Sequence, residues 1–346
     1  MTINEAAIDR KNNLNIIRLV ASLMVLYMHS FAICLGVQDK DVMDVITAHQ
    51  AQSGGVAVYI FFIISGFLIC RSYDRSSSLW SYTKARFLRI WPLYFIVVTV
   101  YTFIIGALLT DYPFDVYFFS EIKEYFETLG FLSSSAMLPG VFQYHYNHSM
   151  NGSIWTLMYE VLWYILVVAL APLWKRFKAS IVPIYAVMLL GYMMLSGTGD
   201  SFLLNFFTLG MFFTAGMMFY LFSDRIKLSW KYALVCLGVL IFSIFLSDFK
   251  ALFSLFGGYI IFYIAFQKKY IATWYDKIGD LSYGIYIMAF PIQQTLVECL
   301  GKPTYGYNTL SMNSYLNMLL TLVIVLPLSY LTWHFIEEPC LKLKNK

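Results

Sequence analysis

The sequence predicts an all-α fold: a polytopic membrane helical bundle with about ten transmembrane helices and with both the N- and C-termini cytoplasmic. Composition is the first reason, because 60% of the 346 residues are hydrophobic and only 13% are charged, against about 25% charged in an ordinary soluble domain. The second is that long apolar runs recur along the whole chain. The third is that lysine and arginine gather in alternate connections between these runs. No basic patch typical of nucleic-acid binding is present, so no nucleic-acid partner is expected.

Ten apolar segments justify the predicted helices. They cover residues 14–36, 54–71, 86–109, 153–173, 180–197, 202–222, 230–247, 250–267, 279–300 and 313–336. No small-residue cleavage site follows the first run, so we expect a retained helix there rather than a signal peptide. The connection of about residues 110–152 is the only long one, and we expect it to contain a short surface or re-entrant helix. Residues 1–346 are therefore predicted to form one membrane-embedded domain without a separate soluble domain.

The orientation of the bundle follows from its basic residues. With the N-terminus in the cytoplasm, 19 of the 24 Lys and Arg residues lie in cytoplasmic segments, four lie on the opposite side, and Arg18 lies within the first helix. Cytoplasmic loops of membrane proteins carry such an excess of positive charge. An even number of spans preserves the alternation, which places both termini in the cytoplasm.

The first predicted helix carries two ionisable residues, Arg18 and His29, in an otherwise apolar run. Their spacing places both within about 20° of one helical face and about 16 Å apart along the axis. Ionisable groups inside a membrane are costly, and they usually mark a functional site. Arg18 is expected near the cytoplasmic face, and His29 is expected in the outer half of the helix.

Glu160 is the expected partner of His29. It follows the outer start of the fourth predicted helix by seven residues, and so it reaches a similar depth in the membrane. A histidine and a carboxylate at one depth suit a general-base pair, in which Glu160 orients the imidazole or holds its proton. A structural hydrogen bond between two helices is the other interpretation.

The third predicted helix enters the membrane with Arg86 and Arg89, which lie three residues apart on roughly one face. Two guanidinium groups at a helix N-terminus suit a phosphate-rich ligand, and Arg18 could join them. Ordinary anchoring at the cytoplasmic face is the alternative. In the second predicted helix, the small residues around Ser65 favour close helix packing. No His or Asp adjoins Ser65 in sequence to support a nucleophilic role.

Further polar residues lie near the ends of the predicted helices. A cluster expected to line a cytoplasmic entrance begins the ninth helix and comprises Asp280, Ser282, Tyr283 and Tyr286. His145 and His148 are expected to be solvated in the outer loop. His334, Glu337 and Glu338 are expected at the inner membrane interface. The five cysteines have no metal-ligand spacing, so no metal site is predicted.

Six motifs, taken in order, resemble those of the acyltransferase family 3 membrane proteins, which include bacterial O-antigen O-acetyltransferases. They are Arg18-x10-His29 with Ala21 and Val25 between, Gly55-Val56 through Phe61-Phe62-x-x-Ser65-Gly66-Phe67-Leu68, Arg86-x-x-Arg89-x-x-Pro92, Ser153-x-Trp155-x-Leu157-x-x-Glu160, Ile278-Gly279-Asp280-Leu281-Ser282-Tyr283-Gly284-Ile285-Tyr286 and Ile336-Glu337-Glu338-Pro339. Together they cover nearly the whole chain on the appropriate helices. One position departs from the pattern, because Ala289 stands where many relatives have a histidine. A mechanism that needs a second histidine at this position is therefore disfavoured, and His29 is the expected catalytic histidine.

The resemblance implies an acyltransferase of the bacterial inner (cytoplasmic) membrane, with acyl-CoA in the cytoplasm as the donor, most often acetyl-CoA. It implies as acceptor a sugar hydroxyl of a lipid-linked or growing surface glycan, such as lipopolysaccharide O-antigen. The expected catalytic residues are His29 and Glu160. The residues expected to bind acetyl-CoA are Arg18, Arg86, Arg89, Ser65 and Tyr283.

Two mechanisms and a second class of function stay open from the sequence. His29 either removes the hydroxyl proton as the acceptor attacks the thioester, or it carries the acetyl group as a transient acyl-imidazole. The alternative function is a transporter or flippase for a lipid-linked sugar or an acidic solute, with Arg18, His29 and Glu160 along a substrate or proton path. The lack of an internal sequence repeat and the basic residues at the inner mouth argue against transport.

Overall fold

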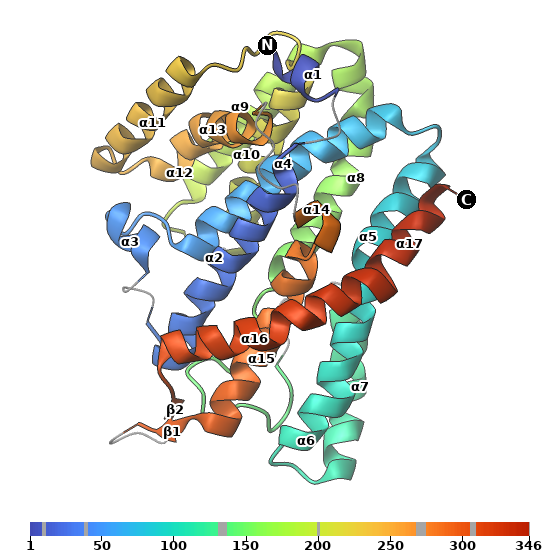
Figure 1. Ribbon diagram of the computed structural model, residues 1–346, viewed down its shortest axis with the longest axis vertical. Helices are drawn as coiled ribbons and strands as arrows, with labels where there is room; N and C mark the ends of the chain where they lie inside the picture. The colour runs from blue at the N-terminus through green and yellow to red at the C-terminus, as the bar shows by residue number, and fades with distance from the viewer. Residues whose placement is uncertain are drawn as a thin grey trace. The chain divides into compact units, whose positions relative to one another are not determined.

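The computed structural model describes residues 1–8, 12–37, 41–130, 137–198, 201–267, 275–304 and 309–345. Within these ranges the chain is mostly helical, and its only sheet is the antiparallel hairpin of β1 (Lys302–Pro303) and β2 (Leu310–Ser311) (Figure 1). Each of the ten predicted apolar segments contains helix, which confirms the helical membrane architecture. The parts of the charge and loop predictions that lie outside the described residues are Arg10, Lys11, Lys40, Lys268, Lys269, Lys346 and residues 131–136.

Seven helical stretches among the described residues are long and apolar enough to cross a membrane. They are α2 (Leu14–Leu35), α4 (Ser53–Arg75), α5 with η1 and α6 (Leu79–Leu109), α8 (Trp155–Arg176), η2 with α9 (Lys178–Leu195), α10 (Ser201–Leu221), and α16 with η4 and α17 (Ser314–Lys342). Shorter apolar stretches are α11 (Trp230–Phe245) and the run of α12, η3 and α13 (Phe249–Ala265). The remaining helices are α1 (Ile3–Ala6), α3 (Val42–Ile46), α7 (Phe114–Leu129), α14 (Tyr275–Ile278), α15 (Ser282–Leu300) and η5 (Leu343–Asn345). Ten spans and cytoplasmic termini stay predictions.

The long connection after α6 contains the short helix expected there, α7. Two tyrosine hydroxyls attach α7 to the preceding helix. Tyr94 donates to the carbonyl oxygen of Thr128 at 2.5 Å, and Tyr117 donates to the carbonyl oxygen of Thr102 at 2.5 Å. Thr102 lies in η1 (Tyr101–Gly106), a π-helical segment whose wider turn leaves carbonyl groups available to such donors.

The chain divides into two compact units, and each is described by itself. Unit 1 comprises Met1–Ala21, Met43–Tyr82 and Tyr159–Lys277. Unit 2 comprises Ser22–Val42, Thr83–Met158 and Ile278–Lys346. Helices α2 and α8 contribute residues to both units.

Unit 1 is built around the contact of α4 with α10, where two glycines let the backbones touch. A Cβ atom on Gly66 would lie 1.9 Å from the carbonyl oxygen of Phe213, and one on Gly216 would lie 2.0 Å from that of Ile63. Small residues at helix contacts are the usual means of close packing in membranes, where lipid removes the hydrophobic drive between helices. The packing role predicted for the small residues near Ser65 is therefore confirmed at Gly66.

Unit 2 is built around α15, which packs against α16 (Ser314–Thr332). A Cβ atom on Gly284 would lie 3.0 Å from the side chain of Ser329, so these two helices also approach closely. At the other end of α15, Phe290 and Val297 form a buried cluster with Ile33 and Cys34 of α2. Helix α15 is thus the element against which the second half of α2 is held.

Candidate active site

His29 lies in the part of α2 that belongs to unit 2, and its side chain is half-buried. The imidazole meets the ring of Phe290 edge-on, with the ring centroids 4.9 Å apart and the planes at 85°. Its Nδ1 atom is buried and has no hydrogen-bond partner among the described residues. Most buried polar atoms in proteins have such a partner, so this nitrogen is a candidate contact for a bound substrate.

The segment that leads into α8 contacts the ring of Phe290. A Cβ atom on Gly152 would lie 2.6 Å from Cε2 of Phe290, so only glycine fits there without movement. The neighbouring residues bond to α15: Asn151 donates to the carbonyl oxygen of Ile287 at 2.9 Å, and the Tyr286 hydroxyl donates to that of Ser153 at 2.6 Å. The position of Phe290 against His29 is thereby fixed.

A buried amide attaches the turn of α2 that bears His29 to α15. Nε2 of Gln293 donates to the carbonyl oxygen of Leu26 at 2.9 Å and to Oγ of Ser30 at 2.7 Å. Asn317 of α16 donates to the carbonyl oxygen of Gln293 at 3.1 Å. The sequence prediction of the site did not include Phe290 or Gln293. The adjacent amides Gln293 and Gln294, inside an apolar run, were the signal that could have indicated this polar contact.

Arg89 of α5 (Leu79–Val100) lies between two acidic side chains of unit 2. Its guanidinium is 2.7 Å from Oδ2 of Asp280 and 3.7 Å from Oε2 of Glu337, and it also lies over the ring of Tyr283. The π-helical segment η4 (Trp333–Glu337) carries Glu337, whose side chain is only 3% exposed. Arg89 is therefore part of a buried ion-pair network, in addition to any role in binding the donor.

One expectation about this end of unit 2 needs correction. Asp280 is buried, and its Oδ1 accepts the hydroxyl of Ser282 at 2.5 Å, so this cluster forms a packed network in place of an open entrance. Tyr283 donates to the carbonyl oxygen of Ile90 at 2.9 Å. Glu337 is buried within the protein, 3.7 Å from the Arg89 guanidinium, and its place at the inner membrane interface stays a prediction.

Glu160 lies on α8 in unit 1, where the structure brings it together with Ser65. The Ser65 hydroxyl donates to Oε1 of Glu160 at 3.3 Å, and the Tyr164 hydroxyl one helical turn later donates to the same oxygen. Sequence reasoning found both Glu160 and Ser65 but did not place them side by side. His29 belongs to unit 2, so the predicted pairing of Glu160 with His29 stays a prediction.

Arg18 and Arg86 complete the predicted donor-binding set. Arg18 lies on the part of α2 that belongs to unit 1, whereas Arg86 lies on α5 in unit 2. Both side chains are half-buried. Arg86 precedes Arg89 by one helical turn, so the two guanidinium groups start from neighbouring positions on α5.

The connection between α7 and α8 contains a buried histidine that the sequence prediction placed in solvent. His145 is only 3% exposed, because Gln294 and Glu298 of α15 enclose its imidazole. His148 is half-buried, and its Nδ1 lies 2.9 Å from the carbonyl oxygen of Phe142. The expectation of a solvated loop is wrong for His145, whose partners lie about 150 residues later in the chain.

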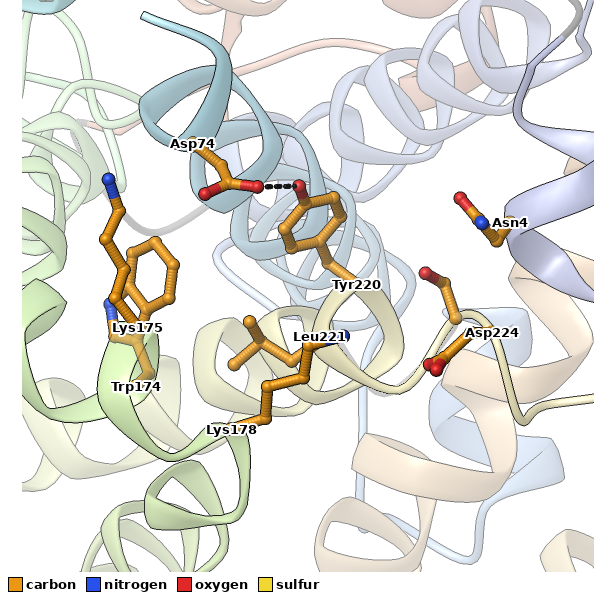
Figure 2. A pocket seen from close by; sticks show the side chains of 9 residues that line it. Asn4, Asp74, Trp174, Lys175, Lys178, Tyr220, Leu221 and Asp224 are labelled. Atoms are coloured by element: carbon orange, nitrogen blue, oxygen red, sulfur yellow. Dashed lines mark hydrogen bonds between the residues drawn. The ribbon is translucent and has the colours of Figure 1, made fainter.

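A pocket of about 400 Å³ lies at the ends of α4, α8 and α10 in unit 1 (Figure 2). Its charged lining residues are Asp74, Lys175, Lys178 and Asp224. Asp74 accepts a hydrogen bond of 2.8 Å from the hydroxyl of Tyr220, as Figure 2 shows. Two lysines and two aspartates cancel in formal charge, so the pocket does not favour a polyanion such as the phosphates of CoA.

Comparison with known proteins identifies the family. The acyltransferase domain family, Acyl_transf_3, matches residues 11–334. An O-acetyl transferase of Shigella phage Sf6 is 32% identical over 354 aligned residues, which cover 95% of this chain and 96% of the relative. Nodulation protein 10 of Rhizobium leguminosarum bv. viciae is 29% identical over 198 residues, which cover 54% of this chain and 52% of the relative. No solved structure matches the chain significantly. The family match spans His29, Glu160 and all the motifs up to His334, and the chain therefore belongs to the acyltransferase 3 family of membrane acyltransferases.

Proposed function

We propose that the protein transfers an acetyl group from cytoplasmic acetyl-CoA to a sugar hydroxyl of a lipid-linked or growing surface glycan, such as lipopolysaccharide O-antigen, in the bacterial inner membrane. The name of the phage relative, an O-acetyl transferase, supports acetyl as the group transferred to oxygen. The excess of basic residues in the predicted cytoplasmic segments supports a donor that enters from that side.

His29 is the proposed general base. In this step the glycan hydroxyl oxygen attacks the thioester carbonyl carbon while an imidazole nitrogen of His29 takes the hydroxyl proton. The carbon–sulfur bond then breaks, and the imidazolium returns the proton to the leaving thiolate, so that an O-acetyl ester and a thiol result. The observation that carries this role is the buried Nδ1 atom without a partner, beside a ring that holds the imidazole in place.

Glu160 is proposed to assist the transfer through its carboxyl group. Its Oε1 atom accepts two hydroxyl hydrogen bonds, from Ser65 and Tyr164, which hold the side chain in place. Both hydroxyl groups bond to Oε1, and neither of them bonds to Oε2. The proposal needs a functional test, because Glu160 and His29 belong to different units.

The proposed donor site comprises Arg18, Arg86, Arg89, Ser65 and Tyr283. Guanidinium groups recognise phosphate through paired hydrogen bonds. Arg86 is a useful probe of this site, because its replacement leaves the 2.7 Å ion pair of Arg89 with Asp280 in place. We expect Arg86→Ala to raise the KM for acetyl-CoA, and Arg86→Lys to recover part of the loss. If neither variant changes the KM, the phosphate-binding role is wrong. Lys175→Ala in the charge-balanced pocket is the matched control.

The decisive experiment follows radiolabelled acetyl from acetyl-CoA into a glycan acceptor with the purified protein. Since a general base typically contributes about 10²–10⁴-fold, His29→Ala should lose transfer by that factor while the protein still inserts into membranes. Full activity of His29→Ala would overturn the assignment. A rapid quench without acceptor tests the second mechanism, because a transient acyl-imidazole would leave label on the wild-type protein and none on His29→Ala.

The acyltransferase family membership favours the enzyme over the transporter. The enzyme and the transporter leave different products. An acyltransferase leaves covalent label in the glycan, whereas a transporter moves the solute unmodified. The same labelling experiment therefore tests both.

A further inference from the structure

The imidazole of His145 is buried in unit 2, and both of its ring nitrogens have an oxygen partner. Nδ1 lies 2.9 Å from Oε1 of Gln294, and Nε2 lies 2.8 Å from Oε2 of Glu298. The ring also stacks on Phe142, with the centroids 4.6 Å apart. A neutral imidazole has one donor nitrogen and one acceptor nitrogen. Two oxygen partners therefore raise the question of which atoms carry the protons.

The orientation of the Gln294 amide follows from its other contacts. Its Nε2 atom lies 2.6 Å from the carbonyl oxygen of Asn147 and 2.8 Å from that of Ser149. Carbonyl oxygens only accept hydrogen bonds, so both positions need the N–H groups of the amide. Oε1 therefore faces His145, and Nδ1 of His145 carries the proton that it donates to this oxygen.

The contact between His145 and Glu298 then requires a further proton. With one proton committed to Gln294, a neutral imidazole presents only a lone pair at Nε2, and an ionised carboxylate presents only lone pairs. At 2.8 Å these would repel, whereas a proton between Nε2 and Oε2 makes a charge-assisted hydrogen bond. The pair thus holds one proton more than a neutral imidazole beside a carboxylate, whichever of the two atoms carries it.

The proton shared by His145 and Glu298 can exchange with the solvent. Among the described residues, Glu298 is the only acidic group in an ion pair with His145. His148, in the same segment, bonds to the carbonyl oxygen of Phe142. The imidazole has no exposed surface, but the Glu298 side chain is 28% exposed. A proton can therefore leave to hydroxide through the carboxyl group while the ring stays packed.

This pair holds the segment that supports the proposed active site. The Gln294 amide bonds the backbone at Asn147 and Ser149 to α15. The same segment continues to Gly152, which lies against Phe290, and Phe290 contacts His29. We propose that the proton shared by His145 and Glu298 clamps this segment on α15 and so positions Phe290 against His29. His145 and Glu298 are thus positioning residues for acyl transfer, and alkaline conditions release the clamp.

The variant Glu298→Gln separates this proposal from a purely structural ion pair. A glutamine amide can turn its NH₂ group toward Nε2 of a neutral imidazole, so the clamp then needs no additional proton. Wild-type transfer should fall about tenfold per pH unit once the proton is lost, the slope set by one proton. Glu298→Gln should keep its rate over the same range. The control is Glu127→Gln on α7, whose carboxylate pairs only with the exposed Lys123 at 3.5 Å.

A second measurement does not depend on the acyl transfer proposed above. Hydrogen–deuterium exchange of the peptide covering residues 145–151, normalised for intrinsic exchange, should show protection that falls at alkaline pH in the wild type but persists in Glu298→Gln. Equal pH profiles of the wild type and Glu298→Gln in exchange would overturn the clamp. A wild type that retains the pH-dependent protection but acetylates no glycan would overturn the proposed function and leave the clamp supported.

Discussion

The rings of His29 and Phe290 meet edge-on, with centroids 4.9 Å apart and planes at 85°. This contact joins the proposed base on α2 to α15, and Gly152 also lies against the Phe290 ring. The imidazole has no hydrogen bond at Nδ1 to hold it among the described residues, so the aromatic contact is the interaction that orients the ring.

Replacing Gly152 should therefore impair transfer without removing a catalytic group. In Gly152→Ala the new methyl group would lie 2.6 Å from Cε2 of Phe290, so the ring must shift and its contact with His29 changes. A displacement of about 1 Å at a reacting group can cost about 10²-fold in rate. We expect kcat to fall by about that factor, as measured by radiolabelled acetyl transfer. Gly238→Ala is the matched control, because a Cβ atom there meets nothing within 4 Å.

Removing Arg89 should destabilise the protein as well as affect donor binding. Arg89→Ala would leave Asp280 and Glu337, which are 9% and 3% exposed, without their cation. Removing one partner of a buried ion pair typically costs about 3–5 kcal/mol. Thermal unfolding in detergent should show this loss, and Asp280→Asn in the same chain should restore part of it. If Arg89→Ala leaves the stability unchanged but raises the KM for acetyl-CoA, Arg89 acts only in binding the donor. Lys123→Ala, in an exposed ion pair, is the control and should change stability little.

Glu160→Gln tests the carboxylate while keeping its hydrogen bonds. A glutamine oxygen can still accept from Ser65 and Tyr164, so the unfolding temperature should stay close to that of the wild type. If Glu160 acts as a charged group in the transfer, the rate should fall by about 10²-fold, the lower end for an acid–base group. Ser65→Ala removes the 3.3 Å bond and should change the unfolding temperature little, while a higher KM for acetyl-CoA in this variant would report the proposed donor contact of Ser65. A wild-type rate in Glu160→Gln would reduce Glu160 to a structural residue.

The contact of α4 with α10 should be intolerant of any added side chain. Gly66→Ala and Gly216→Ala each place a methyl group about 2 Å from a backbone carbonyl oxygen of the other helix, at Phe213 and Ile63 respectively. Overpacking of this kind costs typically about 1–3 kcal/mol. Both variants should unfold at lower temperature in detergent. Gly238→Ala in α11 should not, because alanine favours helix over glycine and the site is open. Equal stability of all three would contradict the close approach.

The predictable part of the fold is the part set by local pattern. All ten apolar segments contain helix, because the length and composition of a run specify a membrane helix without information on its neighbours. The short helix α7 and the packing role of Gly66 were predictable for the same reason. The ionisable residues Arg18, His29, Glu160, Arg86 and Arg89 also stood out by their cost in an apolar run.

The lateral contacts were not predictable, because depth along a helix says nothing about which helices adjoin. Arg89 finds its carboxylates at Asp280 and Glu337, far along the chain. Phe290 contacts His29 from α15, and its sequence position, next to Ala289 in an apolar run, does not indicate this contact. The burial of His145 depends on Gln294 and Glu298, so its own loop sequence could not indicate it.

The close contact of α4 and α10 at Gly66 and Gly216 limits which molecules can pass between these two helices of unit 1. Where two backbones touch, neither a lipid tail nor an acyl chain can pass between the helices. A gap that admits a thioester arm therefore cannot open at this crossing of unit 1. Ser65, the neighbour of Gly66 on α4, donates a hydrogen bond to Glu160 of α8, so the carboxylate lies beside the closed crossing.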